Sequence, residues 1–110
     1  MNIDIEKYVG DIYYYPEKYD LEIVTSIDYS GGNYEFDYRV VWRHKSTGKL
    51  YTARDSGCSC PTPFENYMTI ESLEEYSYNY VRNEALEESR KDYYVGDSIS
   101  EFIDKLPRNK

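Results

Sequence analysis

Residues 21–55 read LEIVTSIDYSGGNYEFDYRVVWRHKSTGKLYTARD, and apolar side chains alternate with polar ones over much of this stretch. The alternation runs through residues 21–29 and again through residues 34–42, with the period of two that a half-buried β-strand requires. In the first of these strands, the side chains expected to share the buried face are Leu21, Ile23, Ile27 and Tyr29. Residues 30–33 (SGGN) and 45–49 (KSTGK) are short turns of the kind that joins antiparallel neighbours. The sequence therefore predicts a three-stranded antiparallel meander over residues 21–55, with residues 50–55 as its third strand.

The segments on either side of the meander are less regular. Residues 1–20 are expected to form an N-terminal arm, irregular or briefly extended, with a turn at residues 16–19. Residues 56–68 are expected to form a rigid connector, because Pro61 and Pro63 remove backbone donors and restrict the residues before them. A chain of 110 residues has the length of one domain, so residues 1–110 are taken as a single unit.

Two helices are predicted in residues 69–106. The first begins at a Thr69 cap and continues through Arg90, with glutamates in its first turn and apolar side chains at helical spacing. Those apolar side chains are Ile70, Leu73, Tyr76, Tyr80 and Val81. The second helix has a capping-box pattern at residues 98–101, and its apolar stripe of Ile99, Phe102, Ile103 and Leu106 ends before Pro107. The expected fold class is α+β, a three-stranded antiparallel meander packed against two C-terminal helices.

Tyrosine is unusually abundant, with 15 residues in the chain. A tyrosine buries a large apolar ring but needs a partner for its hydroxyl, so the core is expected to use rings whose hydroxyls reach its rim. Tyr34, Tyr38 and Tyr80 are expected to be core residues. The run at residues 13–15 cannot all point inward, so at least one of its rings should be exposed or meet a partner. Tyrosine is also enriched at protein interfaces.

Charge is segregated along the chain, which has a formal net charge of −8. Acidic residues far outnumber basic ones in residues 65–104, whereas residues 39–54 contain no acid and hold Arg39, Arg43, Lys45, Lys49 and Arg54. The overall sign disfavours binding to nucleic acid or anionic lipid and permits binding to a basic protein surface. Two alternatives stay open. The basic hairpin could stack and neutralise a single nucleic-acid strand, and the acidic helix could imitate a row of phosphates.

These features together predict a surface that binds another protein. The expected contact residues combine the tyrosine run with acidic side chains of the predicted helix: Tyr13, Tyr14, Tyr15, Glu71, Glu74, Glu75, Glu87 and Glu88. Tyrosine supplies rigid contact area, and carboxylates supply charge complementary to a basic partner. Surface carboxylates also serve simply to keep a protein soluble, so the acidic residues alone do not identify a binding surface.

The segment around Cys58 and Cys60 is the most distinctive local sequence. A closed zinc site needs four ligands, and one chain offers at most these two thiolates and His44, so only a homodimer could complete four cysteines. A nucleophile scheme would pair Cys58 or Ser56 with His44, oriented by Asp55, but the spacing is not characteristic of any enzyme class. The simpler interpretation is a turn of small residues between strand and helix. We therefore expect no enzyme activity, cofactor or metal, and keep a zinc-bridged or structural homodimer using Cys58 and Cys60 as the alternative.

The expected location is the cytoplasm. No stretch approaches the roughly 18 consecutive apolar residues typical of a membrane span, and the start MNIDIEKY lacks the basic and apolar regions of a signal peptide. Two cysteines separated by one residue would close only a very small disulfide ring, so a reducing compartment is the simpler expectation.

Three strings carry a resemblance to a known group of proteins. They are residues 14–22 (YYPEKYDLE), residues 34–43 with YEFD and VWR, and residues 55–65 (DSGCSCPTPFE). Over about its first two thirds the chain resembles a family of small uncharacterised proteins of actinobacteriophages that carry a Gly-Cys-Ser-Cys-Pro-x-Pro-Phe-Glu motif. The resemblance implies no catalytic residue. It implies a phage accessory protein that acts in the host cytoplasm by binding a host protein, such as an inhibitor of host machinery or defence.

Overall fold

The computed structural model describes residues 11–30, 35–58, 63–67, 69–91 and 96–108. It is an α+β protein whose four strands form one antiparallel sheet in the order β1-β2-β3-β4. The elements are α1 (Asp11–Tyr14), the 3-10 helix η2 (Pro16–Tyr19), β1 (Leu21–Asp28), β2 (Glu35–His44), β3 (Leu50–Cys58), the 3-10 helix η3 (Ile70–Ser72), β4 (Glu74–Glu75), α2 (Tyr78–Lys91) and α3 (Gly96–Asp104). None of the described helices has the length and apolar composition that crossing a membrane requires.

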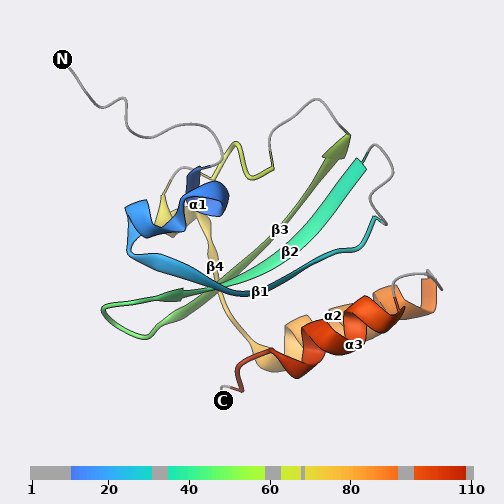
Figure 1. Cartoon of the computed structure of the whole chain (residues 1–110). Coiled ribbons are helices and arrows are strands. Elements are labelled where there is room, and N and C mark those ends of the chain that lie inside the picture. Colours follow the sequence, from blue (N-terminus) through green and yellow to red (C-terminus); the bar gives the residue numbers. More distant parts are fainter. Residues whose placement is uncertain (1–10, 31–34, 59–62, 68, 92–95, 109–110) are drawn as a thin grey trace.

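Helical segments cover both faces of this sheet. Figure 1 shows α1 on one face and the paired helices α2 and α3 on the other. The predicted meander is confirmed for β1, β2 and β3, although β3 continues through Cys58 and so takes up the first three residues of the predicted connector, and the predicted C-terminal helices are present. Two expectations about the flanking segments were wrong. The sheet has a fourth strand, and residues 11–14 of the N-terminal segment form the helical turn α1 rather than an irregular or extended arm, whereas the turn expected at residues 16–19 is present as η2.

The fourth strand arises because the chain has to cross from one face of the sheet to the other. Leu73 is buried in the core beneath α1, whereas Tyr76 is buried in the core beneath α2 and α3. An extended backbone spans that distance around the sheet edge, and there β4 pairs with β3 through Thr52 and Tyr51. The helix predicted from Thr69 is therefore replaced by η3, β4 and a later helix. Ser77 caps that helix, since its Oγ accepts a hydrogen bond from the Tyr80 amide at 3.3 Å.

A β-bulge in β1 changes which side chains share a face. The β1–β2 register shifts between Ile23 and Thr25, so Val24 is the extra residue. Leu21 consequently packs on the α1 side, while Ile27 and Tyr29 pack beneath α2 and α3. Our expectation that Leu21, Ile23, Ile27 and Tyr29 would line one face was wrong for this reason.

The two cores use different side chains. On the α1 side, Trp42 and Phe64 are fully buried, and the Trp42 indole Nε1 donates to the Ile12 carbonyl at 2.9 Å. The other core contains Val41, Val81 and Ala85 together with Ile99 and Phe102 of α3 and Leu106 just after it. The apolar stripe predicted for the last helix is thus buried as expected, although α3 begins at Gly96, ahead of Ser98.

The expected tyrosine core residues have three different outcomes. Tyr38 is half-buried and packs against the core beneath α1. Tyr80 is 57% exposed, because α2 buries the side that carries Val81 and Ala85, so the expectation of a core residue was wrong there. Tyr34 lies outside the described residues. Tyr29 and Tyr76 are buried, and the Tyr76 hydroxyl donates to the Pro107 carbonyl at 2.7 Å.

Candidate partner-binding surface

The tyrosine run divides between core and surface. The Tyr13 ring stacks on Tyr38 and also contacts Phe64, each at a centroid distance of 5.4 Å, and burial raises the pKa of the Tyr13 hydroxyl. Tyr14 and Tyr15 are 52% and 53% exposed. The prediction that at least one ring of this run is exposed is confirmed. Within this run, Tyr14 and Tyr15 are the two rings that can contact a partner over a large area without disturbing the core.

Glu71, Glu74 and Glu75 lie in the segment that crosses the sheet edge, and all three are exposed. The Glu74 side chain is 68% exposed, and its Oε1 lies 4.0 Å from Arg39 Nη1. The Tyr80 ring lies over the same guanidinium, with its centroid 5.7 Å from Arg39 Cζ. Glu74 and Tyr80 therefore flank one buried arginine. We refer to Glu71, Glu74, Glu75 and Tyr80 as the β4 patch.

Glu87 and Glu88, the other predicted acidic contacts, lie on α2 and differ sharply in exposure. The Glu87 side chain is 64% exposed, and its Oε2 is 3.2 Å from Arg90 Nη1 one turn away. The Glu88 side chain is only 15% exposed, and its Oε2 is 3.1 Å from Arg54 Nη2 and 3.5 Å from Lys91 Nζ. Glu88 is already used inside the molecule, so we do not include it in the surface offered to a partner.

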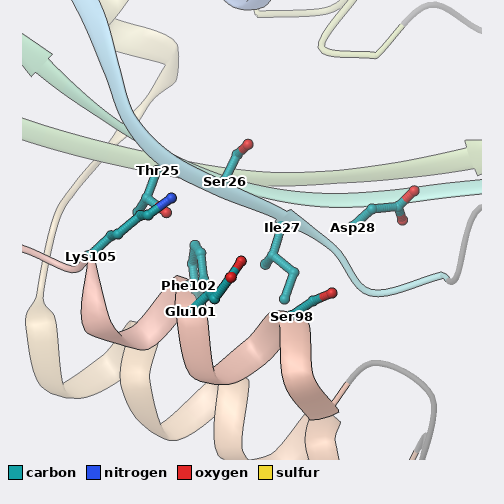
Figure 2. A pocket seen from close by; sticks show the side chains of 8 residues that line it. All are labelled: Thr25, Ser26, Ile27, Asp28, Ser98, Glu101, Phe102 and Lys105. Carbon is teal, nitrogen blue, oxygen red and sulfur yellow. The ribbon is translucent and has the colours of Figure 1, made fainter.

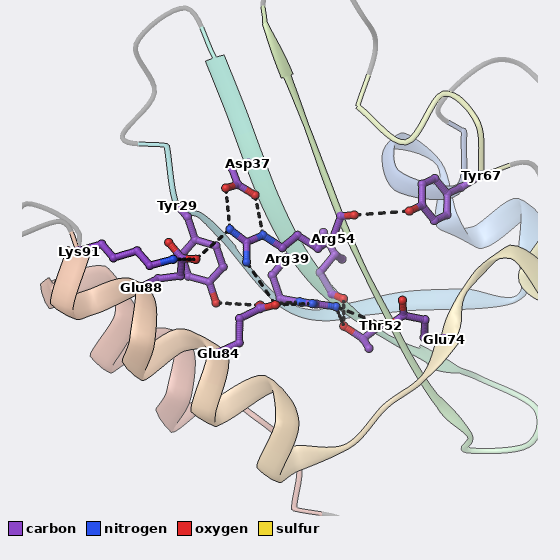
Figure 3. A network of polar contacts seen from close by, with 11 residues as sticks. Tyr29, Asp37, Arg39, Thr52, Arg54, Tyr67, Glu74, Glu84, Glu88 and Lys91 are labelled. Atoms are coloured by element: carbon purple, nitrogen blue, oxygen red, sulfur yellow. Dashed lines mark hydrogen bonds and ion pairs between the residues drawn. The ribbon is translucent and has the colours of Figure 1, made fainter.

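A polar network connects α2 to the sheet beneath the β4 patch, and Figure 3 shows its members. Glu84 accepts two hydrogen bonds from Arg39, at 2.8 Å from Nε and 2.6 Å from Nη2. Asp37 accepts an equivalent pair from Arg54, at 2.8 Å from Nε and 2.7 Å from Nη2. Arg54 Nη1 is also 3.3 Å from Glu84 Oε2, which joins the two pairs. Such bidentate geometry holds both planar groups in fixed orientations.

Burial makes this network costly to disrupt. The Arg39 and Glu84 side chains are only 4% and 13% exposed. Burial alone would raise the pKa of Glu84, but the hydrogen bonds and charge of Arg39 outweigh it and hold that pKa below its ordinary value. Hydrogen bonding to Asp37 likewise raises the pKa of Arg54. Both arginines and Glu84 stay charged in the folded protein near neutral pH.

Acid should weaken the protein through Glu84. The lowered pKa means that the unfolded chain takes up the Glu84 proton at a higher pH than the folded chain does, so stability falls as pH falls. We expect the stabilisation by the Glu84 carboxylate to be complete above its ordinary pKa of 4.5 and to be lost as pH falls through the lower folded-state value. Urea unfolding of the wild type and Glu84→Gln from about pH 7 to about pH 3 measures this. The stability difference between the two proteins should shrink towards low pH, and a constant difference would contradict the assignment.

Three of the five cations of the predicted basic hairpin are paired with carboxylates. Arg39 and Arg54 are neutralised by acidic groups of β2 and α2, and Arg43 Nη1 lies 2.8 Å from Glu22 Oε2. The fully buried Trp42 cannot stack on a nucleotide base. The single-strand nucleic-acid alternative therefore loses most of the groups on which it depended.

Sequence reasoning missed Glu84 and Asp37 as the partners of these arginines. One signal was available. Arg39 and Arg54 are directly opposite each other on β2 and β3, and like charges at cross-strand positions are unfavourable unless carboxylates lie between or beside them. The spacing of Glu84 and Glu88 places both on one side of a helix, where they can reach two such arginines.

The structure separates the residues of the nucleophile scheme. Cys58 pairs with Glu35 at one end of β2 and His44 lies at the other end, so their backbones are about 30 Å apart. His44 contacts Thr47 and Asp20, and Asp55 accepts a hydrogen bond from the Phe64 amide at 2.7 Å. Within the described ranges, no group of three or more His, Cys, Asp or Glu side chains could hold a metal ion. Cys60 lies outside those ranges, so the zinc-bridged alternative stays a prediction.

One family of proteins matches the chain over the whole of the described fold. The family, described as a domain of unknown function (DUF7574), matches residues 10–109 of the chain. That range includes every helix and strand from α1 to α3. No curated protein and no solved structure matches the chain.

Proposed function

The chain belongs to the DUF7574 family, a domain of unknown function, and we propose from its own surface that it is a non-enzymatic protein that binds a basic partner protein. The observation that carries the proposal is the β4 patch. Glu74 and the exposed ring of Tyr80 flank the buried Arg39, and two further exposed carboxylates, Glu71 and Glu75, lie in the same segment of the chain. The net charge of −8 adds a field that attracts basic surfaces.

Rigidity beneath the patch supports this proposal. Arg39 donates hydrogen bonds to Glu84 of α2 and, at 3.3 Å, to Thr52 Oγ1 of β3. The side chain beneath Glu74 and Tyr80 is therefore held in place by two elements. A partner that binds rigid side chains loses less conformational entropy than one that binds flexible ones. Tyrosine is enriched at protein interfaces, and the rims of interfaces are polar.

We propose a host protein as the partner, following the resemblance to actinobacteriophage proteins. A small acidic phage protein that covers a basic surface of a host protein would inhibit that protein by occupying the site where its natural acidic ligand binds. The host cytoplasm is then the place of action. The exposed Tyr14 and Tyr15 form a second, smaller contact area near α1.

Reversing the charge of the β4 patch should abolish capture of the partner. In Glu71→Lys/Glu74→Lys/Glu75→Lys, three rim charges worth up to about 1 kcal/mol each become repulsive, and we expect binding to weaken by about 10- to 100-fold. The measurement is affinity capture from an actinobacterial host lysate with mass spectrometry, followed by titration of the captured protein.

The matched control for this experiment is Glu17→Lys/Glu35→Lys/Asp104→Lys, which makes the same change in net charge at three other exposed positions. The control should bind within about threefold of the wild type, because its substitutions act only through the screened long-range field. Equal weakening by both triple variants would show that total charge rather than the β4 patch determines binding. Absence of any captured protein with the wild type would contradict the proposed function itself.

A further inference from the structure

β1 forms one edge of the sheet, and no described strand pairs with its outer side. Figure 1 shows β1 at the border of the sheet on the side of α3. An edge strand has a row of backbone N–H and C=O groups that another extended segment can pair with. Proteins usually blunt such an edge with charges, prolines or a covering element.

The register identifies which backbone groups face outward. The Tyr29 amide donates to the Asp37 carbonyl at 2.8 Å, so this is a hydrogen-bonded position of the β1–β2 ladder. Hydrogen-bonded and non-hydrogen-bonded pairs alternate along an antiparallel ladder. Ser26 and Asp28, which pair with Val40 and Tyr38, therefore turn their own N–H and C=O groups to the free edge.

A groove follows the edge at these same residues. Its volume is about 290 Å³, and its walls are residues 25–28 of β1, three side chains of α3, namely Ser98, Glu101 and Phe102, and Lys105 directly after α3. Figure 2 shows that α3 runs antiparallel to β1, with Ser98 near Asp28 and Lys105 near Thr25. Ile27 and Phe102 are 6% and 2% exposed and form the apolar floor. A strand edge and a helix thus border an open groove beside Ser26 and Asp28.

The charges of the groove favour a basic occupant. Asp28 and Glu101 contribute two carboxylates against the single ammonium group of Lys105. Glu101 and Lys105 are exposed, and no ion pair involves either of them within the part of the chain that the structure describes. Asp28 Oδ1 already accepts hydrogen bonds from the Ser30 amide, the Ser30 hydroxyl and the Asp37 amide. Glu101 is therefore the acidic group free to receive a cation.

We propose that this groove binds an extended basic segment of the partner protein, which adds to the sheet as a further strand beside β1. The backbone of the segment pairs with Ser26 and Asp28, and a lysine or arginine of the segment lies beside Glu101. This mode is β-strand addition, in which the main chain provides affinity and alternate side chains provide specificity. The inference rests on the proposed function, since it assigns the same partner a further contact at a different surface.

The test uses a defined probe, the eight-residue peptide Thr-Lys-Thr-Lys-Thr-Lys-Thr-Lys with blocked ends, titrated into ¹⁵N-labelled protein. We expect saturable shifts of the Ser26 and Asp28 amide signals. The corresponding glutamate peptide, and the lysine peptide N-methylated at alternate residues, should bind at least about tenfold more weakly, because the first reverses the charge and the second blocks strand pairing. Equal binding of the N-methylated peptide, or shifts confined to residues 70–80, would overturn the proposal.

Two variants locate the effect. Ser26→Pro removes an outward N–H while leaving the β1–β2 ladder intact, and Glu101→Lys removes the cation site without touching the backbone. Each should weaken binding of the lysine peptide about tenfold, and unaltered binding by both would overturn the inference. Glu71→Lys/Glu74→Lys/Glu75→Lys should still bind the peptide at β1. Its separate loss of the captured partner distinguishes failure of the groove from failure of the β4 patch.

Discussion

Replacing Glu84 with leucine should lower the free energy of unfolding by about 3–5 kcal/mol, the range found when one member of a buried ion pair is removed. Arg39 would lose both of its 2.6–2.8 Å hydrogen bonds to carboxylate, and its acidic partner among the described residues would then be Glu74, 4.0 Å away and largely exposed. A guanidinium whose side chain is 4% exposed would then be left almost uncompensated. Arg54 would lose a second contact at 3.3 Å.

Urea unfolding monitored by circular dichroism measures this loss of stability. Two further variants test whether the loss comes from the unpaired charge of Arg39. Arg39→Met/Glu84→Leu removes both charges together, so most of the lost stability should return. Glu87→Leu changes an exposed glutamate of the same helix and should alter stability by no more than about 0.5 kcal/mol. A Glu84→Leu protein as stable as Glu87→Leu would show that the network does not hold α2 on the sheet.

The second large effect is expected at Trp42. Trp42→Ala should cost about 3–5 kcal/mol, because it empties a fully buried site between the sheet and α1. The indole contacts Phe64 edge-on at a centroid distance of 5.5 Å, and its Nε1 bond to the Ile12 carbonyl ties α1 to β2. Loss of the ring therefore loosens the whole layer on that face.

Thermal and urea unfolding test this prediction, with Trp42→Phe as the control. Phenylalanine keeps an aromatic ring but cannot donate to Ile12, so its cost should be clearly smaller than that of alanine. In the Trp42→Ala protein, α1 should also be more accessible to protease than in the wild type. A Trp42→Ala protein within about 1 kcal/mol of the wild type would mean that the core beneath α1 contributes little to stability.

The sequence predicted the part of the fold that depends on local patterns. Alternation over residues 34–42 and two short turns are enough to define β2 and its neighbours, and the stripe of Ile99, Phe102 and Leu106 is enough to identify α3. The bulge at Val24 could not be predicted, because Leu21, Ile23 and Ile27 fit an uninterrupted alternation and no residue in the strand marks the extra position. It decides that Leu21 and Ile27 face opposite layers.

The fourth strand depended on tertiary structure for a different reason. Residues 69–76 have apolar side chains at helical spacing, and Glu71, Glu74 and Glu75 suit a first helical turn. That local preference loses because Leu73 and Tyr76 belong to cores on opposite faces of the sheet. Extended residues between them connect the two cores around the edge, which no pattern within the segment encodes.

The candidate site was predictable only in part. Crowding in the tyrosine run predicted that at least one of its rings is exposed, without identifying Tyr14 and Tyr15, and the exposed Glu71, Glu74 and Glu75 were among the predicted contact residues. Glu88 was also predicted to be a contact residue, but it forms an ion pair with Arg54. That pair depends on α2 packing against β3, and the two residues are 34 positions apart in the chain. The groove beside β1 was not foreseen, since it needs α3 to lie along an edge strand far from it in sequence.

The most direct test of the central proposal is amide hydrogen exchange of the protein with and without its captured partner. If the β4 patch is the binding surface, complex formation should slow exchange across residues 69–80, while the exposed loop at residues 45–49 should exchange at an unchanged rate. Unchanged exchange at residues 69–80 in a saturated complex would contradict the account.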